Sequence, residues 1–316
     1  MALRAGILRA WRSIASSDVY YSFRSSKVTV VAAIVTAIIF LACFAAPLIA
    51  LQDPYDPANF DLSVAMKPPV LWGGEWAFPL GTDDQGRDMY SAILYGTRLS
   101  LIVGFLSVLL AMALGVTIGL VSGYVGGATD AVLMRAADVQ LTFPSLLIAL
   151  TLDGIVRGLI AAKWWLFEYV NHDDIALPVI IVSLGLAFWP QYARTVRGAV
   201  LVERTKDYVN AARIIGVRPW RILSRHILPN AMGPVLVIAT INLAVAIITE
   251  ATLSFLGVGM PKTQPSLGTL IQIGNDYLSS GDLWITVSPG IMLALLVLAV
   301  NLLGDWLRDA LNPKLR

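Results

Sequence analysis

The sequence predicts an all-α polytopic membrane protein with six transmembrane helices. Of its 316 residues, 57% are hydrophobic and only 14% are charged, whereas a soluble domain carries about 25% charged residues. Six stretches without charged side chains follow one another along the chain. This composition excludes a soluble globular protein and a disordered chain. The formal net charge of +2 gives no indication of a nucleic-acid partner.

The charge-free stretches locate the transmembrane helices, because a helix needs about 20 apolar residues to cross the hydrocarbon core. All but one of them are long enough to cross unaided. The stretch 139–152 is too short, so we expect its helix to continue past Asp138 and Arg135, or past Asp153 on its other side. The stretches are residues 28–52, 99–129, 139–152, 175–193, 227–249 and 283–304.

Positive charge predicts the orientation, because cytoplasmic loops carry an excess of Lys and Arg. With both termini in the cytoplasm, most of the 23 Lys and Arg lie on the cytoplasmic side. The loop before the second helix is acidic instead. The predicted parts are a cytoplasmic N-terminal segment (1–27), a first transmembrane helix (28–51), a periplasmic loop (52–98), a five-helix core (99–306) that contains a cytoplasmic hairpin (203–229), and a cytoplasmic tail (307–316).

The cytoplasmic loop 194–230 predicts a helix–turn–helix hairpin. Residues 202–215 contain neither Gly nor Pro and are predicted to form one helix. Gly216 stands where a helix ends in the left-handed conformation, Pro219 at the favoured first position of a second helix, and Pro229 where that helix should end. Apolar and small residues accompany the charges: Ala211, Ala212, Ile214, Ile215, Val217, Trp220, Ile222 and Leu223. Lipid headgroups could cover this surface, but its size favours a docking partner.

The sequence offers no catalytic or metal centre. The nucleotide-binding pattern G-x-x-x-x-G-K-[ST] is absent, so we do not expect this chain to hydrolyse ATP or to bind a cofactor. Two histidines and the single Cys43 are too few for a metal site or an internal disulfide. Two other classes stay open. An ion-coupled secondary transporter would need paired acids at the membrane midplane, and a membrane-embedded enzyme would need clustered polar groups.

Several polar residues fall within or beside the predicted spans. Glu250 is the most conspicuous, because an ionised acid costs about 2.5–3.5 kcal/mol at the bilayer centre. It lines a transport path or contacts a partner subunit, or else it is a structural hydrogen-bonding group. Arg135 and Asp138, and likewise Asp153 and Arg157, have the spacing of ion pairs on one helix face. Close packing of the second helix is indicated by Gly104, Gly115, Gly119 and Gly123.

Residues 81–88 (GTDDQGRD) form a short acidic stretch in the outer loop. A calcium loop would require a different ligand spacing, with a Glu at its twelfth position. A turn network in which Arg87 joins neighbouring Asp side chains fits the pattern better. We expect it to leave an acidic rim on the outer face.

Several segments together resemble a known family. Asn210-Ala211-Ala212, Gly216 and Leu228-Pro229 are similar to the E-A-A-x-x-x-G-x9-I-x-L-P loop of permease subunits in bacterial ABC importers, with Asn210 in place of the acidic residue and His226 in place of the isoleucine. Residues 81–88 and 95–100 resemble the outer-loop signature of the C-type permeases of dipeptide, oligopeptide and nickel importers. The pattern continues through Met134-Arg135, Asp138, Phe143-Pro144, Glu250-Ala251, residues 253–257, Gly304-Asp305, Arg308-Asp309 and Pro313.

The resemblance implies the type I ABC importer permease fold in a bacterial inner membrane. A B-type permease would pair with this chain as a heterodimer. Two ATP-binding subunits would dock beneath the pair and hold ATP and Mg²⁺, and a periplasmic or lipid-anchored solute-binding protein would deliver the cargo. Di- or oligopeptides are the first expected substrates. Nickel chelates, opines, glycosides and peptide-like antibiotics are the alternatives.

The resemblance also implies roles for particular residues. Coupling to the ATPases is expected of Asn210, Ala211, Ala212, Gly216, Val217, Pro219, Trp220, Leu228 and Pro229. Glu250 and Ser254 are expected to line the translocation path or the interface with the partner permease. The signature of the periplasmic loop comprises Gly81, Thr82, Asp83, Gly86, Arg87 and Asp88. No catalytic residue and no metal ligand is implied.

Overall fold

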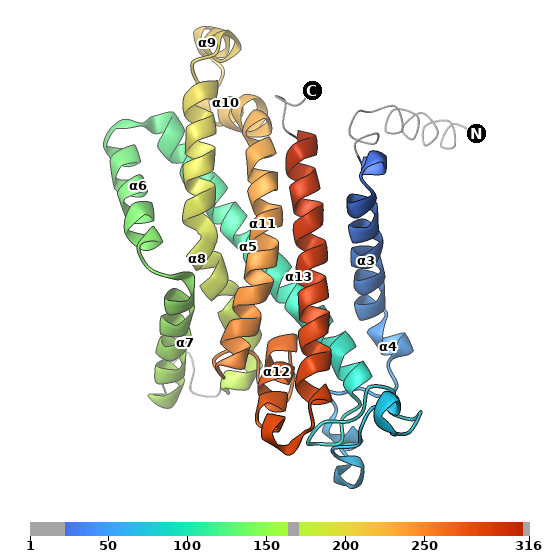
Figure 1. The fold of residues 1–316 in the computed structure, drawn as a ribbon. Helices are drawn as coiled ribbons and strands as arrows, with labels where there is room; N and C mark the ends of the chain where they lie inside the picture. Colours follow the sequence, from blue (N-terminus) through green and yellow to red (C-terminus); the bar gives the residue numbers. More distant parts are fainter. Residues whose placement is uncertain (1–22, 164–170, 312–316) are drawn as a thin grey trace, which may run out of the picture.

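A computed structural model of the protein describes residues 23–163 and 171–311. Over these ranges the fold is a bundle of helices, with an isolated bridge between Thr82 and Asp88 as its only β-type pairing (Figure 1). The long helices are α3 (Lys27–Phe44), α5 (Met89–Val125), α8 (His172–Glu203), α11 (Leu228–Phe255) and α13 (Trp284–Leu311). The shorter α-helices are α4 (Ala46–Ile49), α6 (Gly127–Leu141), α7 (Ser145–Ala161), α9 (Asp207–Ile214), α10 (Pro219–Ile222) and α12 (Leu267–Asn275).

The described part of the chain has 5 helices that are long and apolar enough to cross a membrane, and 6 if the bent pair α6 and α7 forms one span. This confirms the predicted fold class. Most of the predicted N-terminal segment 1–27 lies outside the described residues, as does the second half of the predicted tail 307–316.

The third crossing departs from the single helix that we expected. α6 and α7 are bent by 93° at a short break where Phe143 precedes Pro144. Proline lacks a backbone N–H and disfavours the helical conformation in the residue before it. Pro144 itself is not helical, with φ −57° and ψ 136°. The helical pair extends past both Asp138 and Asp153, so the short apolar stretch is lengthened at both ends rather than at one.

α5 and α8 pack closely at the centre of the bundle. Gly115, Gly119 and Gly123 recur every four residues on α5, and each brings its backbone against α8. A Cβ atom added at Gly119 would lie only 2.5 Å from the carbonyl oxygen of Ala193. Gly104 faces Ile247 of α11 instead. The glycines therefore serve helix packing, as the sequence predicted.

The two ends of the bundle differ in construction. At one end, the loop between α4 and α5 folds beside α12 and the start of α13 (Figure 1). At the other end, α9 and α10 connect α8 to α11, and α9 stands beyond the ends of the long helices. α3 lies at the edge of the bundle, where it packs against α13 and leaves most of its apolar surface exposed. The two predicted sites thus lie at opposite ends of the molecule.

Candidate functional site

The hairpin of residues 203–229 is built around a left-handed turn. α9 ends at Ile214, and Gly216 follows with a φ of +76°. The N–H of Gly216 donates to the carbonyl of Arg213 at 3.1 Å, and the N–H of Val217 donates to that of Ala212 at 3.0 Å. These two bonds satisfy carbonyls that the helix end would leave unpaired. Pro219 occupies the start of α10, so both predicted boundaries are confirmed.

Two other predictions for the hairpin were wrong. The first helix does not run through 202–215, because α8 continues to Glu203 and α9 begins only at Asp207. Pro229 does not end the second helix either. A π-helical turn, Leu223–Ile227, leads directly into α11, and the N–H of Leu228 donates to the carbonyl of Leu223. This wider turn lets the chain pass Pro229, which has no N–H of its own, without a break.

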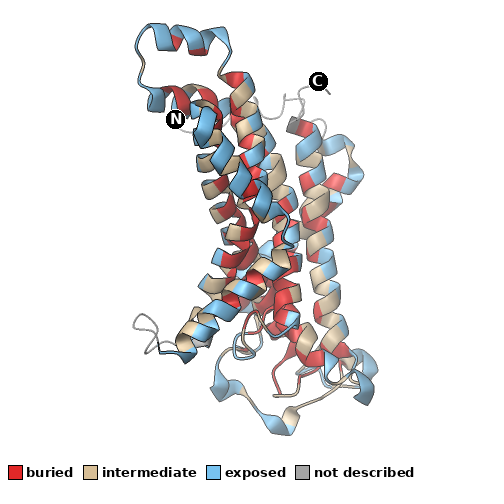
Figure 2. Cartoon of the chain, turned by 90° about the vertical axis from the view of Figure 1, so that its left-hand side faces the viewer, coloured by how far each residue is buried: buried red, intermediate tan, exposed pale blue. Residues whose placement is uncertain are grey.

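The hairpin has an inner and an outer face. Val209, Ala212, Ile222 and Leu223 are buried against the rest of the chain. In contrast, Ile214 is 85% exposed, Ile215 78% and Trp220 76%. Figure 2 shows the exposed face of the hairpin beyond the buried centre of the bundle. The expected coupling residues Asn210, Ala211, Gly216, Pro219 and Pro229 are exposed as well, and Val217 and Leu228 are half-buried.

Ala212 departs from its expected role. Coupling to the ATPases is expected of Ala212 together with Ala211, and a docking role requires an exposed side chain. Its side chain is only 6% exposed and belongs to the hydrophobic core. The core also contains Val209 and Ile222. Ala212 therefore holds the hairpin to the bundle, and Ala211 is the one of the two that faces outward.

A polar cluster at the base of the hairpin was missed by sequence reasoning. The hydroxyl of Tyr208 donates to the carboxylate of Glu203, and the amide of Asn230 donates to that hydroxyl at 3.0 Å. Lys206 forms an ion pair with Glu203 at 2.8 Å. The amide of Asn230 also donates to the carbonyl of His226 at 2.9 Å. Glu203 and Lys206 are only three residues apart, but Asn230 lies 22 residues from Tyr208, so no local spacing reveals the whole cluster.

The outer loop has the network that we predicted around Arg87. Its Nε donates to Oδ2 of Asp83 at 2.6 Å, and both side chains are fully buried. Its Nη1 donates to the carbonyl of Lys262 at 2.8 Å, which ties this loop to the segment before α12. Within the loop, the hydroxyl of Thr82 donates to the carbonyl of Val64 at 2.6 Å and accepts from the N–H of Lys67 at 2.8 Å.

The remaining signature residues give the loop its shape. Gly81 and Gly86 have positive φ angles, and a Cβ atom at Gly86 would lie 2.0 Å from the carbonyl oxygen of Asp61. Asp88 caps α5 by accepting from the N–H of Ser91 at 2.8 Å. Because Asp83 and Asp88 are buried, they do not form the exposed acidic rim that we expected.

Burial changes the ionisation of this loop. It raises the pKa of Asp88 and that of Asp84, and the neighbouring Asp83 raises the pKa of Asp84 further. Asp84 in turn raises the pKa of Tyr277, whose hydroxyl lies 3.4 Å from its carboxylate. A carboxyl with a raised pKa binds its proton more tightly in the folded chain than in the unfolded one. Asp84 and Asp88 therefore favour the folded state as the pH falls toward their pKa.

Glu250 and Ser254 are enclosed by the chain itself. Oε2 of Glu250 accepts from the hydroxyl of Ser100 on α5 at 2.7 Å, and Oε1 accepts from Ser254 at 2.8 Å. The Ser254 oxygen accepts in turn from the N–H of Met260 at 3.0 Å. Neither Glu250 nor Ser254 has exposed surface in this single chain. This geometry favours the structural alternative for Glu250 over a path-lining role.

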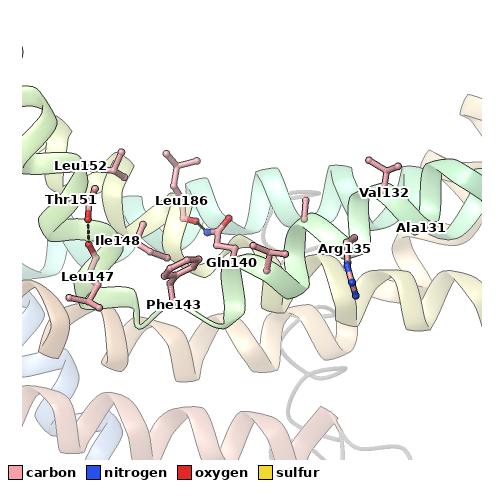
Figure 3. Close-up of a pocket in the computed structure, with 12 residues that line it drawn as sticks. Ala131, Val132, Arg135, Gln140, Phe143, Leu147, Ile148, Thr151, Leu152 and Leu186 are labelled. Carbon is pink, nitrogen blue, oxygen red and sulfur yellow. Dashed lines mark hydrogen bonds between the residues drawn. The ribbon is translucent and has the colours of Figure 1, made fainter.

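Of the two ion pairs predicted within the third crossing, one forms and the other does not. Arg157 and Asp153 form theirs at 2.5 Å. Asp138 pairs with Arg194 of α8 at 3.7 Å, so the expected pairing with Arg135 was wrong. Arg135 instead lies at one end of an apolar cavity of about 960 Å³ on the α6–α7 pair (Figure 3). Gln140 also lines this cavity, and its side-chain amide donates a hydrogen bond to the carbonyl of Leu186.

Comparison with known proteins agrees with this architecture. Residues 115–316 match the family described as binding-protein-dependent transport system inner membrane component. Residues 16–69 match the N-terminal transmembrane domain of oligopeptide transport permease C. A chain of the MetNI methionine ABC transporter, solved in inward-facing conformations, superposes with a TM-score of 0.54 at 20% identity, covering 71% of this chain and 97% of that one. This likeness shows the fold.

Curated relatives align over nearly the whole chain. The dipeptide transport system permease protein DppC of Haemophilus influenzae is 36% identical over 95% of each chain. The di/tripeptide permease DppC of Pseudomonas aeruginosa is 38% identical over 88% of this chain and 85% of its own. The oligopeptide permease OppC of Bacillus subtilis is 36% identical over 95% and 90%.

Fold and site together define a multi-pass helical membrane subunit with a protruding hairpin between two of its spanning helices. The chain belongs to the family of binding-protein-dependent transport system inner membrane components. It is a permease subunit of an ABC importer, and so a transport subunit rather than an enzyme.

Proposed function

We propose that this permease imports di- or oligopeptides. The observation that carries the substrate class is the extent of the likeness to relatives named for dipeptides, di/tripeptides and oligopeptides, which covers 95%, 88% and 95% of this chain. The enclosed Glu250 removes one reason to consider an ion-coupled transporter, because an acid that carries ions must reach water at some point of the cycle.

The transport complex contains this chain and a B-type permease as a heterodimer. Two ATP-binding subunits, which hold ATP and Mg²⁺, supply the energy, and a periplasmic or lipid-anchored solute-binding protein supplies the peptide. Both termini and the hairpin of residues 203–229 face the cytoplasm. The exposed arginines of the hairpin support this orientation, because basic loops are retained on the cytoplasmic side: Arg213, Arg218, Arg221 and Arg225.

The hairpin couples ATP hydrolysis to transport. Ile214, Ile215 and Trp220 offer an exposed apolar surface, and such a surface on a folded protein marks an interaction site. The hydrogen-bonded turn at Gly216 fixes α9 relative to α10, and the helical run from Pro219 leads into α11 without a break in the chain of helical turns. When the ATPase subunits move this surface, α8 and α11 move with it.

Reconstitution of the complete transporter in proteoliposomes tests the proposal. Uptake of a radiolabelled dipeptide should require ATP and the binding protein, and unlabelled peptides should compete while nickel chelates and glycosides should not. Ala211→Asp places a charge on the exposed face without disturbing the core, and Gly216→Val strains a backbone that has a positive φ. Both variants should insert normally, hydrolyse ATP and fail to transport.

Ala128→Asp is the matched control, since Ala128 is exposed in the first turn of α6 and outside the hairpin. It should transport normally. Competition by a chelate or a glycoside rather than by peptides would show that the substrate class is wrong. Undiminished transport in both hairpin variants would show that the coupling role is wrong.

A further inference from the structure

The hydroxyl group of Tyr208 joins three elements at the base of the hairpin. Tyr208 lies in the first turn of α9. Its hydroxyl donates to Glu203, the last residue of α8, and accepts from Asn230, which lies in the first turn of α11. A single oxygen atom therefore connects the hairpin to both of the membrane helices that flank it.

Hydrogen bonds and an ion pair join the residues of the Tyr208 cluster. The cluster comprises Glu203, Lys206, Tyr208, His226 and Asn230. Glu203 is only 7% exposed and forms an ion pair with Lys206 at 2.8 Å. Asn230 donates to the carbonyl of His226 in the π-helical turn at 2.9 Å. The ring of Tyr208 lies 6.3 Å from that of His226. Hydrogen bonds to a charged group such as the Glu203 carboxylate are stronger than those between neutral groups.

The Tyr208 cluster spans the least regular part of the connection between α8 and the hairpin. Residues 204–206 between α8 and α9 are not helical, so the backbone alone would let α9 swing relative to α8. The π-helical turn Leu223–Ile227 is a second irregular segment on the other side. Apolar contacts of Val209 and Ala212 hold α9 to the bundle, but such contacts are not directional. The hydrogen bonds of Tyr208 are directional, so they fix the orientation of α9 relative to α8 and α11.

We propose that Tyr208 is the positioning residue that makes α8 and α11 move together with the hairpin. The proposal rests on the coupling role assigned to the hairpin above. When α9 is displaced, the bond to Glu203 transmits the displacement to α8, and the bond from Asn230 transmits it to α11. Without the hydroxyl, α9 pivots at residues 204–206, and the motion is lost before it reaches the membrane.

The ionisation of the cluster fits this role. Burial raises the pKa of the Tyr208 hydroxyl, and the adjacent Glu203 raises it further. The hydrogen bond to Glu203 also raises the pKa of Lys206. Tyr208 thus keeps its proton and Lys206 keeps its charge at neutral pH, so the direction of each hydrogen bond stays fixed.

Tyr208→Phe tests the proposal, because it removes the hydroxyl and keeps the ring beside His226. In the reconstituted complete transporter, the dipeptide taken up per ATP hydrolysed should fall about tenfold, which corresponds to about 1.4 kcal/mol. Hydrolysis itself should continue. Asn230→Ala should lower the same ratio, whereas Glu203→Gln should preserve most of it because the amide oxygen still accepts the Tyr208 hydrogen bond.

Tyr124→Phe is the matched control, since the Tyr124 ring keeps its contact with Arg213 when the hydroxyl is removed. An unchanged ratio in Tyr208→Phe would overturn the proposal, as would an equal loss of hydrolysis and uptake, which would indicate a structural role only. The Ala211→Asp variant distinguishes failure of the Tyr208 proposal from failure of the coupling role of the hairpin. If it uncouples while Tyr208→Phe does not, only the role of Tyr208 fails; if neither uncouples, the coupling role of the hairpin fails.

Discussion

In the outer loop, the buried side chains of Arg87 and Asp83 neutralise each other. Arg87 and Asp83 have no exposed side-chain surface and lie 2.6 Å apart. Removing one partner of a buried ion pair leaves the other without compensation, at a cost of about 3–5 kcal/mol. We therefore expect Arg87→Met to lower the free energy of unfolding by about that amount, measured by thermal unfolding of the purified chain in detergent.

Lys67→Met provides the comparison for Arg87. Lys67 pairs with Glu75 at 3.0 Å, but the Glu75 side chain is 64% exposed, and exposed pairs contribute about 0–1 kcal/mol. The double variant Asp83→Leu with Arg87→Met should recover part of the loss, because no buried charge remains. Equal melting temperatures for Arg87→Met and Lys67→Met would refute this account of the outer loop.

The sequence predicts such contacts only when the partners are close along the chain. Asp83 and Arg87, and Asp153 and Arg157, are four residues apart and were both foreseen. Asp138 pairs instead with Arg194, because the packing of α6 against α8 decides its partner. The Tyr208 cluster was missed for the same reason, since 22 residues separate Tyr208 from Asn230.

Among the helices, the contact between α5 and α8 sets the spacing of the bundle. A methyl group at Gly119 would lie 2.5 Å from a backbone oxygen of α8, which cannot move without shifting the whole helix. Overpacking of this kind costs about 1–3 kcal/mol, so Gly119→Ala should destabilise the folded chain in the same detergent assay.

Gly154→Ala is the counterpart on α7, where nothing lies within 4 Å of the added methyl group. Because alanine is the better helix former by about 1 kcal/mol, this variant should be neutral or slightly stabilising. A similar loss of stability in both variants would contradict this account, because the added methyl group at Gly154 meets no neighbour within 4 Å.

Helix boundaries show where prediction from the sequence reaches its limit. Gly216 and Pro219 were placed correctly, because a left-handed residue and a missing N–H act within one turn. Pro144 and Pro229 have the same local chemistry but opposite outcomes. The chain breaks at Pro144, whereas a π-helical turn carries it past Pro229. The chemistry of proline alone therefore does not decide between these outcomes.

For the whole molecule, hydropathy predicts the fold class well, because the membrane requires its spanning segments to be helical. Unpaired backbone groups are excluded from the hydrocarbon core, so long apolar stretches form helices whatever their neighbours are. The order in which the helices pack is not imposed in this way. α8 has 56% of its apolar window buried, against 22% in α3, and the glycines of α5 let α8 approach closely.

The orientation of the bundle can be tested with single cysteines, because Cys43 is the only one in the chain and is buried. In a Cys43→Ala background, Trp76→Cys and Ile214→Cys place thiols at positions that are 82% and 85% exposed, in the outer loop and in the hairpin. A membrane-impermeant maleimide applied to intact spheroplasts should label only the first. The second should react once the membrane is opened. The reverse pattern would require the basic hairpin to have been translocated across the membrane against the usual retention of Lys and Arg, and it would leave the hairpin on the side where no ATP-binding subunit can reach it.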